Sequence, residues 1–135
     1  MKASLSHIQL NISHSNATFY KELFALLGWP TIYDQENMVA FGSFTDLSIW
    51  LLESQKPEEN DYDKKGMNHL GLKVAKQSEV DEVVKFLEAK NIRALFETPR
   101  HRPEFSGSEQ ETYYQVMFSS PDNILFEVMY TGPKV

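Results

Sequence analysis

Two segments of the chain alternate apolar and polar residues in the same way, and both begin with a histidine. The first runs from His7 to Ile12 and the second from His69 to Val74, which is 69 − 7 = 62 positions further along. Because successive side chains of a strand point to opposite faces of a sheet, the aliphatic residues face a core and each histidine faces away from it. The pattern predicts two related strands that begin in the same manner.

The residues after the first of these strands predict a helix and three further strands. Polar residues at 13–16 are suited to a helix start, and apolar residues then recur at steps of three and four from Ala17 to Leu27 before Gly28 ends the run. Short apolar stretches separated by polar turns predict three strands, at 31–34, 38–42 and 47–52. The first half, residues 5–53, is therefore predicted to be β-α-β-β-β.

The second half repeats this order after a charged connector at 54–66. Ser78 is the expected N-cap of a helix over 79–89, and a long loop is expected at 97–110. The predicted strands lie at 67–74, near 93–96, at 112–118 and at 124–130. Two such units are each too small to bury a sheet face alone, so we expect residues 1–135 to form one α+β domain with an internal repeat, 5–53 and 67–130.

Composition and charge exclude several kinds of protein. Hydrophobic residues make up 41% and charged residues 24% of the chain, as in ordinary globular proteins. The formal net charge of −6 disfavours nucleic acid as a partner. The chain has no apolar segment of 18 residues, so no membrane span is predicted. Without cysteine there is no disulfide, thiolate metal site or cysteine nucleophile. With no signal-peptide pattern, a cytoplasmic location is the default expectation.

An acidic residue in the last predicted strand adds chemistry to the two histidines. Glu127 lies in an otherwise apolar segment, where an unpaired carboxylate would be costly. If it faces the same side as His7 and His69, two imidazoles and one carboxylate form a partial coordination shell for a divalent metal. Such a shell leaves positions open for water or substrate, which is typical of catalytic metal sites.

These motifs, in this order, resemble the vicinal oxygen chelate superfamily. It includes glyoxalase I, extradiol dioxygenases, fosfomycin-resistance thiol transferases and bleomycin-resistance proteins. The resemblance covers nearly the whole chain and depends on three segments, which are HIQLNIS with the following helix, GMNHLGLKV with its helix, and TYYQVMFSSPDNILFEV.

The resemblance implies a glyoxalase-like fold, in which two βαβββ modules form a curved mixed sheet around a central cavity. It implies His7, His69 and Glu127 as ligands of a divalent ion (Zn, Ni, Mn or Fe), and a homodimer. Trp50 falls at the place in the first half that Glu127 takes in the second, where glyoxalase I usually has a carboxylate. Strict glyoxalase I activity is therefore not implied.

Other residues are candidates for binding a small-molecule substrate. Trp50 is either a stacking wall for a ligand or part of the core, and Ser48 and Gln9 share its expected side of the sheet. Either Tyr113 or Tyr114 must face the cavity, and we favour Tyr114. Arg100 belongs to the one cluster of positive charge and could hold a carboxylate or phosphate. His14 and His101 are expected at the surface.

Three functions remain open on the sequence alone. The first is a metal-dependent lyase, isomerase or transferase of glyoxalase type, acting on a small molecule that chelates the metal through vicinal oxygens. The second is a metal-free protein that sequesters a ligand, as bleomycin-resistance proteins do. The third is a non-catalytic domain that uses the fold for protein interaction. The catalytic base and the substrate are not identified by the sequence.

Overall fold

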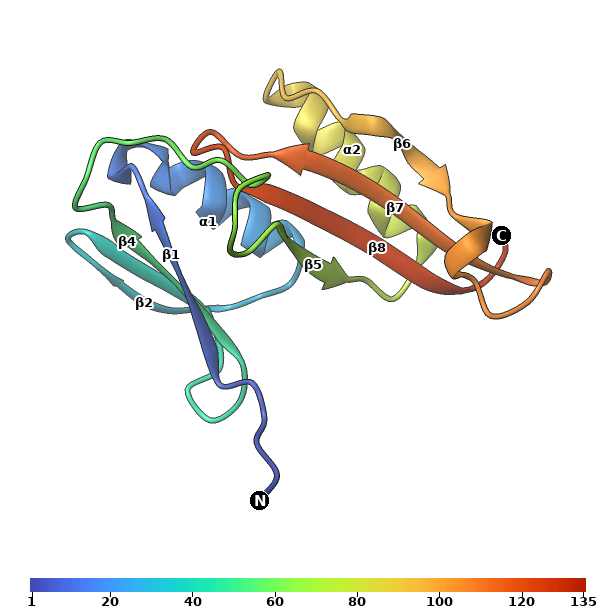
Figure 1. The fold of residues 1–135 in the computed structure, drawn as a ribbon, viewed down its shortest axis with the longest axis horizontal. Coiled ribbons are helices and arrows are strands. Elements are labelled where there is room, and N and C mark those ends of the chain that lie inside the picture. The colour runs from blue at the N-terminus through green and yellow to red at the C-terminus, as the bar shows by residue number, and fades with distance from the viewer. The chain divides into compact units, whose positions relative to one another are not determined.

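The computed structural model describes all 135 residues and divides the chain into two compact units. The first unit is Met1–Glu58 and the second is Glu59–Val135. The boundary falls inside the predicted connector at 54–66, where charged residues without apolar periodicity provide no core. Figure 1 shows both units, and each is described by itself below.

The first unit is a four-stranded mixed sheet with one α-helix. Its strands are ordered β1-β4-β3-β2, with β1 parallel to β4 and the other neighbours antiparallel. The elements are β1 (His7–Ile12), a 3-10 turn η1 (His14–Asn16), α1 (Ala17–Leu26), β2 (Thr31–Gln35), β3 (Met38–Gly42) and β4 (Ser48–Glu53).

Apolar alternation decides which face of this sheet is buried. Leu10 of β1 and Leu51 of β4 are paired in register and almost fully buried. From the helix, Phe24 stacks on Phe41 of β3 with ring centroids 4.5 Å apart. The apolar stripe of α1 thus covers one face, and the histidine face of β1 stays outside this core.

The second unit repeats the topology. Its strands are ordered β5-β8-β7-β6, with β5 parallel to β8 and the other neighbours antiparallel. The elements are β5 (His69–Lys73), α2 (Gln77–Ala89), β6 (Leu95–His101), a 3-10 turn η2 (Pro103–Phe105), β7 (Glu111–Ser119) and β8 (Leu125–Pro133). Two βαβββ modules with one strand order confirm the predicted α+β fold class.

The helix of the second unit covers the face opposite to His69. Val80, Val83 and Leu87 of α2 are at most 1% exposed, and Figure 1 shows α2 running along β7 and β8. Beneath it, Phe118 and Phe126 are stacked with centroids 5.6 Å apart. Residues of odd number in β8, including Glu127, therefore lie on the other, open face.

Two local predictions were wrong. Strand β6 runs to His101, through the region predicted as a loop from 97, because Arg100 and His101 resume pairing with β7 after an irregularity. Phe96 and Glu97 have left-handed backbones at that irregularity, with φ of 55° and 59°. The second helix begins at Gln77, so Ser78 is not its cap; instead the Glu79 carboxylate accepts hydrogen bonds from the backbone N–H groups of residues 75 and 76.

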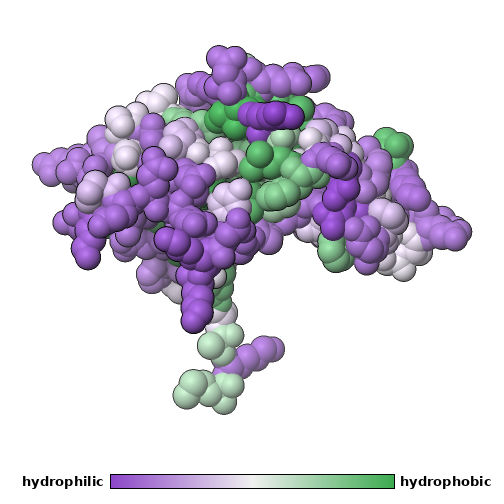
Figure 2. Space-filling model, turned by 45° about the horizontal axis from the view of Figure 1, so that its top comes forward, coloured by the Kyte–Doolittle hydropathy of each residue, from purple (hydrophilic) through white to green (hydrophobic).

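The molecular surface agrees with the composition. The face drawn in Figure 2 is mostly hydrophilic. Neither helix has the length and apolar character needed to cross a membrane.

Candidate metal and substrate site

The register of the two sheets places Trp50 and Glu127 at equivalent positions. His7 is paired with Ser48 and Gln9 with Trp50 across β1 and β4. In the second unit His69 is paired with Leu125, and Gly71 with Glu127, across β5 and β8. Trp50 lies two residues after Ser48, the partner of His7, and Glu127 lies two residues after Leu125, the partner of His69. In each unit, therefore, this residue points to the same face as the histidine. The expected correspondence between Trp50 and Glu127 is therefore confirmed.

His69 and Glu127 are in direct contact on the open face of the second unit. His69 Nε2 lies 3.2 Å from Glu127 Oε2. The other ring nitrogen, Nδ1, lies 2.8 Å from the Asn68 side-chain oxygen. A proton on Nδ1 donated to Asn68 leaves the lone pair of Nε2 directed toward Glu127, which is how metal-binding histidines are usually oriented.

The second oxygen of the Glu127 carboxylate is held by two donors from β7. Glu127 is 5% exposed. Its Oε1 accepts hydrogen bonds from the Gln115 amide at 2.7 Å and from the Tyr113 hydroxyl at 2.5 Å. Burial, and then the hydrogen bond to Glu127, raise the pKa of Tyr113 well above its ordinary value, so this hydroxyl remains a donor. Two donors on Oε1 leave Oε2 as the oxygen available to a ligand beside His69.

These contacts continue into a closed ring of side chains, which we call the Glu127 network: Glu127, Gln115, Arg102, Phe105 and Tyr113. Arg102 donates to the Gln115 oxygen at 2.9 Å, and its guanidinium lies 4.9 Å from the centre of the Phe105 ring. The Phe105 ring is packed edge-on against Tyr113. Because the Gln115 oxygen is occupied by Arg102, its NH₂ group must be the end that faces Glu127.

The geometry of the His69–Glu127 pair suits a divalent ion. For bonds of about 2.0–2.2 Å and angles between octahedral and tetrahedral, two ligand atoms stand about 2.8–3.6 Å apart. The observed separation of 3.2 Å lies inside that interval. Gly71 places no side chain opposite Glu127, and a Cβ added there would come within 3.7 Å of Oε2. The imidazole nitrogen and the carboxylate Oε2 therefore fit two ligand positions of a divalent ion.

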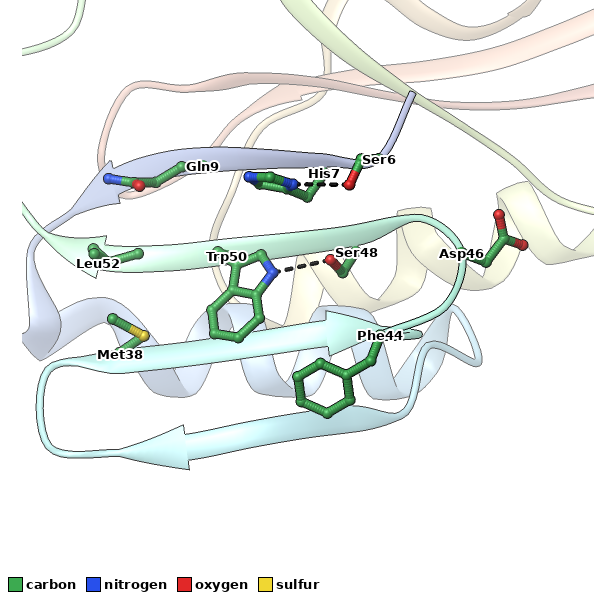
Figure 3. Close-up of a pocket in the computed structure, with 9 residues that line it drawn as sticks. All are labelled: Ser6, His7, Gln9, Met38, Phe44, Asp46, Ser48, Trp50 and Leu52. Carbon is green, nitrogen blue, oxygen red and sulfur yellow. Dashed lines mark hydrogen bonds between the residues drawn. The ribbon is translucent and has the colours of Figure 1, made fainter. Parts of the chain in front are cut away.

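The third predicted ligand, His7, lies in the first unit. Its Nδ1 is 3.0 Å from the Ser6 hydroxyl, which leaves Nε2 pointing along the open face of the sheet (Figure 3). The structure contains no cluster of three or more histidine, cysteine, aspartate or glutamate residues suited to a metal. It brings together His69 and Glu127 in the second unit, and His7 lines a pocket of the first unit.

That pocket has a volume of about 370 Å³ and opens on the face of β1, β3 and β4 (Figure 3). Trp50 is its largest side chain, and its ring N–H donates to the Ser48 hydroxyl at 2.9 Å. The three predicted residues Gln9, Ser48 and Trp50 all line the pocket. Gln9 also donates to the Asn11 side chain.

The prediction for Tyr114 has to be corrected. Its hydroxyl donates to Asp81 of α2 at 2.8 Å, so Tyr114 lies on the helix-covered face, and Tyr113 is the tyrosine beside Glu127. Burial, followed by this hydrogen bond, raises the pKa of Tyr114 to about 12.

Arg100 is in a strand and not in the predicted loop. It is paired with Gln115 and so lies on the open face with Glu127, and it forms an ion pair with Glu97 at 3.6 Å. His14 and His101, which we expected at the surface, are exposed. Sequence reasoning missed Gln115 and Arg102. Counting back in steps of two from Met117, the residue paired with Glu127, would have identified Gln115.

Solved structures of several proteins are similar to this one along nearly the whole chain. A candidate glyoxalase from Bacillus halodurans has a TM-score of 0.75 at 21% identity, with 93% of this chain and 94% of that chain covered. The fosfomycin resistance protein FosX from Listeria monocytogenes, solved with Mn(II) and sulfate, has a TM-score of 0.66 at 25% identity, with 96% and 91% covered. A glyoxalase/bleomycin resistance protein/dioxygenase domain from Frankia sp. EAN1pec has a TM-score of 0.63 at 15% identity, with 98% of each chain covered. No protein-family model matches the chain, and neither does any curated protein.

Proposed function

Because this chain has the fold of the vicinal oxygen chelate superfamily, we propose that it is a metal-dependent enzyme of glyoxalase type. Its substrate is a small molecule that presents two neighbouring oxygens to a divalent ion, and the ion is bound by His7, His69 and Glu127. The observation that carries the proposal is the contact of His69 Nε2 with the uncovered oxygen of a buried glutamate. A FosX structure with Mn(II) supports divalent-metal chemistry on this fold.

Each ligand has its own task in the proposed site. His69 is oriented by Asn68, and Glu127 is held at one oxygen by Gln115 and Tyr113, so both present a lone pair without further rearrangement. When bound by these residues, a divalent ion would supply a positive charge that stabilises negative charge on a substrate oxygen. In the proposed site Glu127 is a ligand of the ion, so a different group would have to move a proton.

The ligand set is tested by metal content. Purified protein is dialysed against Mn(II) or Zn(II), and bound metal is measured by mass spectrometry and by calorimetry. We expect about one ion per chain, with affinity reduced at least about 100-fold in His69→Ala and in Glu127→Gln. His14→Ala is the matched control, because His14 is an exposed histidine outside the proposed site. Equal binding by His69→Ala and the control would contradict the proposal.

A metal-free, ligand-sequestering protein is the second candidate. The observation that favours it is Trp50, which takes the place of a possible carboxylate ligand and lines a pocket of the first unit. The two functions differ in the effect of a chelator: turnover of a small substrate with two neighbouring oxygens that EDTA abolishes supports the enzyme. Tight ligand binding that EDTA leaves unchanged supports sequestration.

We also propose that the protein is a homodimer. Large apolar side chains remain exposed in both units, including Phe44 at 68% and Phe105 at 58%. Analytical ultracentrifugation should give about twice the chain mass of 15.6 kDa.

Mixing His7→Ala with His69→Ala chains then tests whether the third ligand comes from the same chain. Recovery of about a quarter of the normal metal content indicates sites shared between chains. No recovery indicates that each site is built from one chain.

A further inference from the structure

The first unit presents a rigid aromatic surface next to His7. Trp50, Ala40 and Tyr33 are paired across β4, β3 and β2, so their side chains lie in one row on the open face. Ala40 is too small to separate its neighbours, and the rings of Tyr33 and Trp50 meet with centroids 5.6 Å apart. Ala40 itself is 0% exposed. The small residue at the centre of the row is what brings the two aromatic rings into contact.

Two further contacts fix the orientation of the Trp50 ring. Its N–H donates to Ser48, which is 5% exposed, and the Phe44 ring packs against it edge-on at 6.1 Å. The polar atom of the indole is thus satisfied within the protein, and the ring can offer an apolar surface to a ligand. In Figure 3, His7 and Trp50 lie side by side on neighbouring strands.

The charge of the pocket also restricts what it can bind. Asp46 is the one formally charged residue among those that line it, and no lysine or arginine does. Asp46 lies at one end, while Met38 and Leu52 lie at the other end, beyond Trp50 (Figure 3). There is no cation to hold an anionic group along this wall. The volume of about 370 Å³ is within the usual range of small-molecule pockets, about 300–1,000 Å³.

We propose that the substrate carries a planar aromatic group next to its two chelating oxygens. The ring lies against Trp50 and points toward Met38 and Leu52, and the oxygens point toward His7. This inference rests on the proposed function, because His7 is common to the pocket and to the proposed metal site. The first unit then determines which substrates are accepted, and the His69–Glu127 pair of the second unit belongs to the metal.

Mandelate and lactate provide a matched pair of probes. Both are α-hydroxy acids with the same two chelating oxygens, and they differ in a phenyl or a methyl group. Calorimetry with Mn(II)-loaded protein should show mandelate binding at least about tenfold more tightly than lactate. Trp50→Ala should bring the ratio of the two affinities close to one, and Trp50→Phe should retain most of it. Leu26→Ala, which removes an exposed apolar side chain of α1, is the control that should keep the full ratio.

A second measurement works with or without metal. The chain has two tryptophans, of which Trp29 packs against Phe24 and does not line the pocket. In NMR spectra, mandelate should shift the ring N–H signal of Trp50 more than lactate does and should leave that of Trp29 in place. An unmoved Trp50 signal, or equal affinities for the two acids, would overturn the inference. Protein that binds no metal but still shows the Trp50 shift would contradict the proposed function alone.

Discussion

The amide of Gln115 donates a hydrogen bond to the carboxylate of Glu127 across 2.7 Å, and both residues are at most 5% exposed. Arg102 occupies the oxygen of the same amide, so the amide cannot turn around without placing its oxygen against a carboxylate. Gln115 therefore decides which oxygen of Glu127 is free. In the proposed site, Gln115 touches neither the metal nor the substrate, but it controls the orientation of the metal ligand Glu127.

Replacing Gln115 with leucine should reduce both stability and metal binding. The variant leaves Oε1 of Glu127 with one donor fewer in a buried position, which should lower the free energy of unfolding by about 1–3 kcal/mol. Metal affinity should fall about 10–100-fold, since the carboxylate is no longer held with Oε2 toward His69. Urea denaturation and calorimetry measure the two effects. Gln55→Leu, at an exposed glutamine, should change neither.

Removing the guanidinium of Arg102 should have a smaller effect of the same kind. In Arg102→Met the Gln115 amide loses the partner that fixes its orientation, while both donors to Glu127 remain present. We expect metal affinity to fall about threefold to tenfold, less than in Gln115→Leu. The Mn(II) EPR spectrum should broaden as the carboxylate samples more than one position. Arg93→Met, at an exposed arginine of the same unit, should match the unaltered protein, and a larger loss than in Gln115→Leu would contradict this order of effects.

Added metal should stabilise the folded chain. A ligand that binds only the folded state adds about 2.7 kcal/mol at 100 times its dissociation constant. Thermal unfolding with and without Mn(II) should show an increase in melting temperature that EDTA reverses. Glu127→Gln should show no increase, because the amide cannot replace the charged oxygen. An equal increase in this variant would indicate that the ion binds elsewhere.

The sequence predicted the β-α-β-β-β order of elements in each half and the Trp50–Glu127 correspondence because both depend on alternation over several residues. It did not identify the tyrosine beside Glu127. In β7 both faces carry apolar or aromatic residues, as Val116 and Met117 show. The sequence pattern of this strand therefore does not indicate which side chains face the helix and which face the other side. The hydrogen bond from Tyr114 to Asp81 depends on how α2 packs, which no local pattern contains.

Arg100 shows a second limit of local patterns. Its face is determined by the irregularity between residues 95 and 100, where two consecutive residues have positive φ. Neither of them is a glycine, so the segment gave no turn signal. Pairing with β7 resumes only after this irregularity, and that pairing places Arg100 opposite Gln115.

Tyr114 should make the protein less stable at alkaline pH. Burial and the hydrogen bond to Asp81 raise the pKa of Tyr114 to about 12 in the folded state, above the value of 10 expected when unfolded. The folded state favours the neutral phenol, so this stabilisation is complete below pH 10 and is lost as the pH rises to 12. Urea denaturation between pH 8 and 12 should show a smaller decline in Tyr114→Phe than in the unaltered protein. Identical declines would show that another group is responsible.

The two stacked phenylalanine pairs should be comparable in importance. Phe41→Ala in the first unit and Phe118→Ala in the second each remove a fully buried ring, and each should lower the free energy of unfolding by about 3–5 kcal/mol. Denaturation followed by circular dichroism measures both. Phe96→Ala changes a half-exposed ring, so it should lower the free energy of unfolding by only about 0.5 kcal/mol, the usual size of a surface effect.

One module of the repeat has an indole where the other has a carboxylate. Substitutions around Trp50 can change the size and shape of an accepted ligand while the donors around Glu127, all within the second unit, stay untouched. In the proposed site, a change of specificity would need only the exchange of one aromatic or alanine side chain of the first unit, while the second-unit donors that hold Glu127 stay in place.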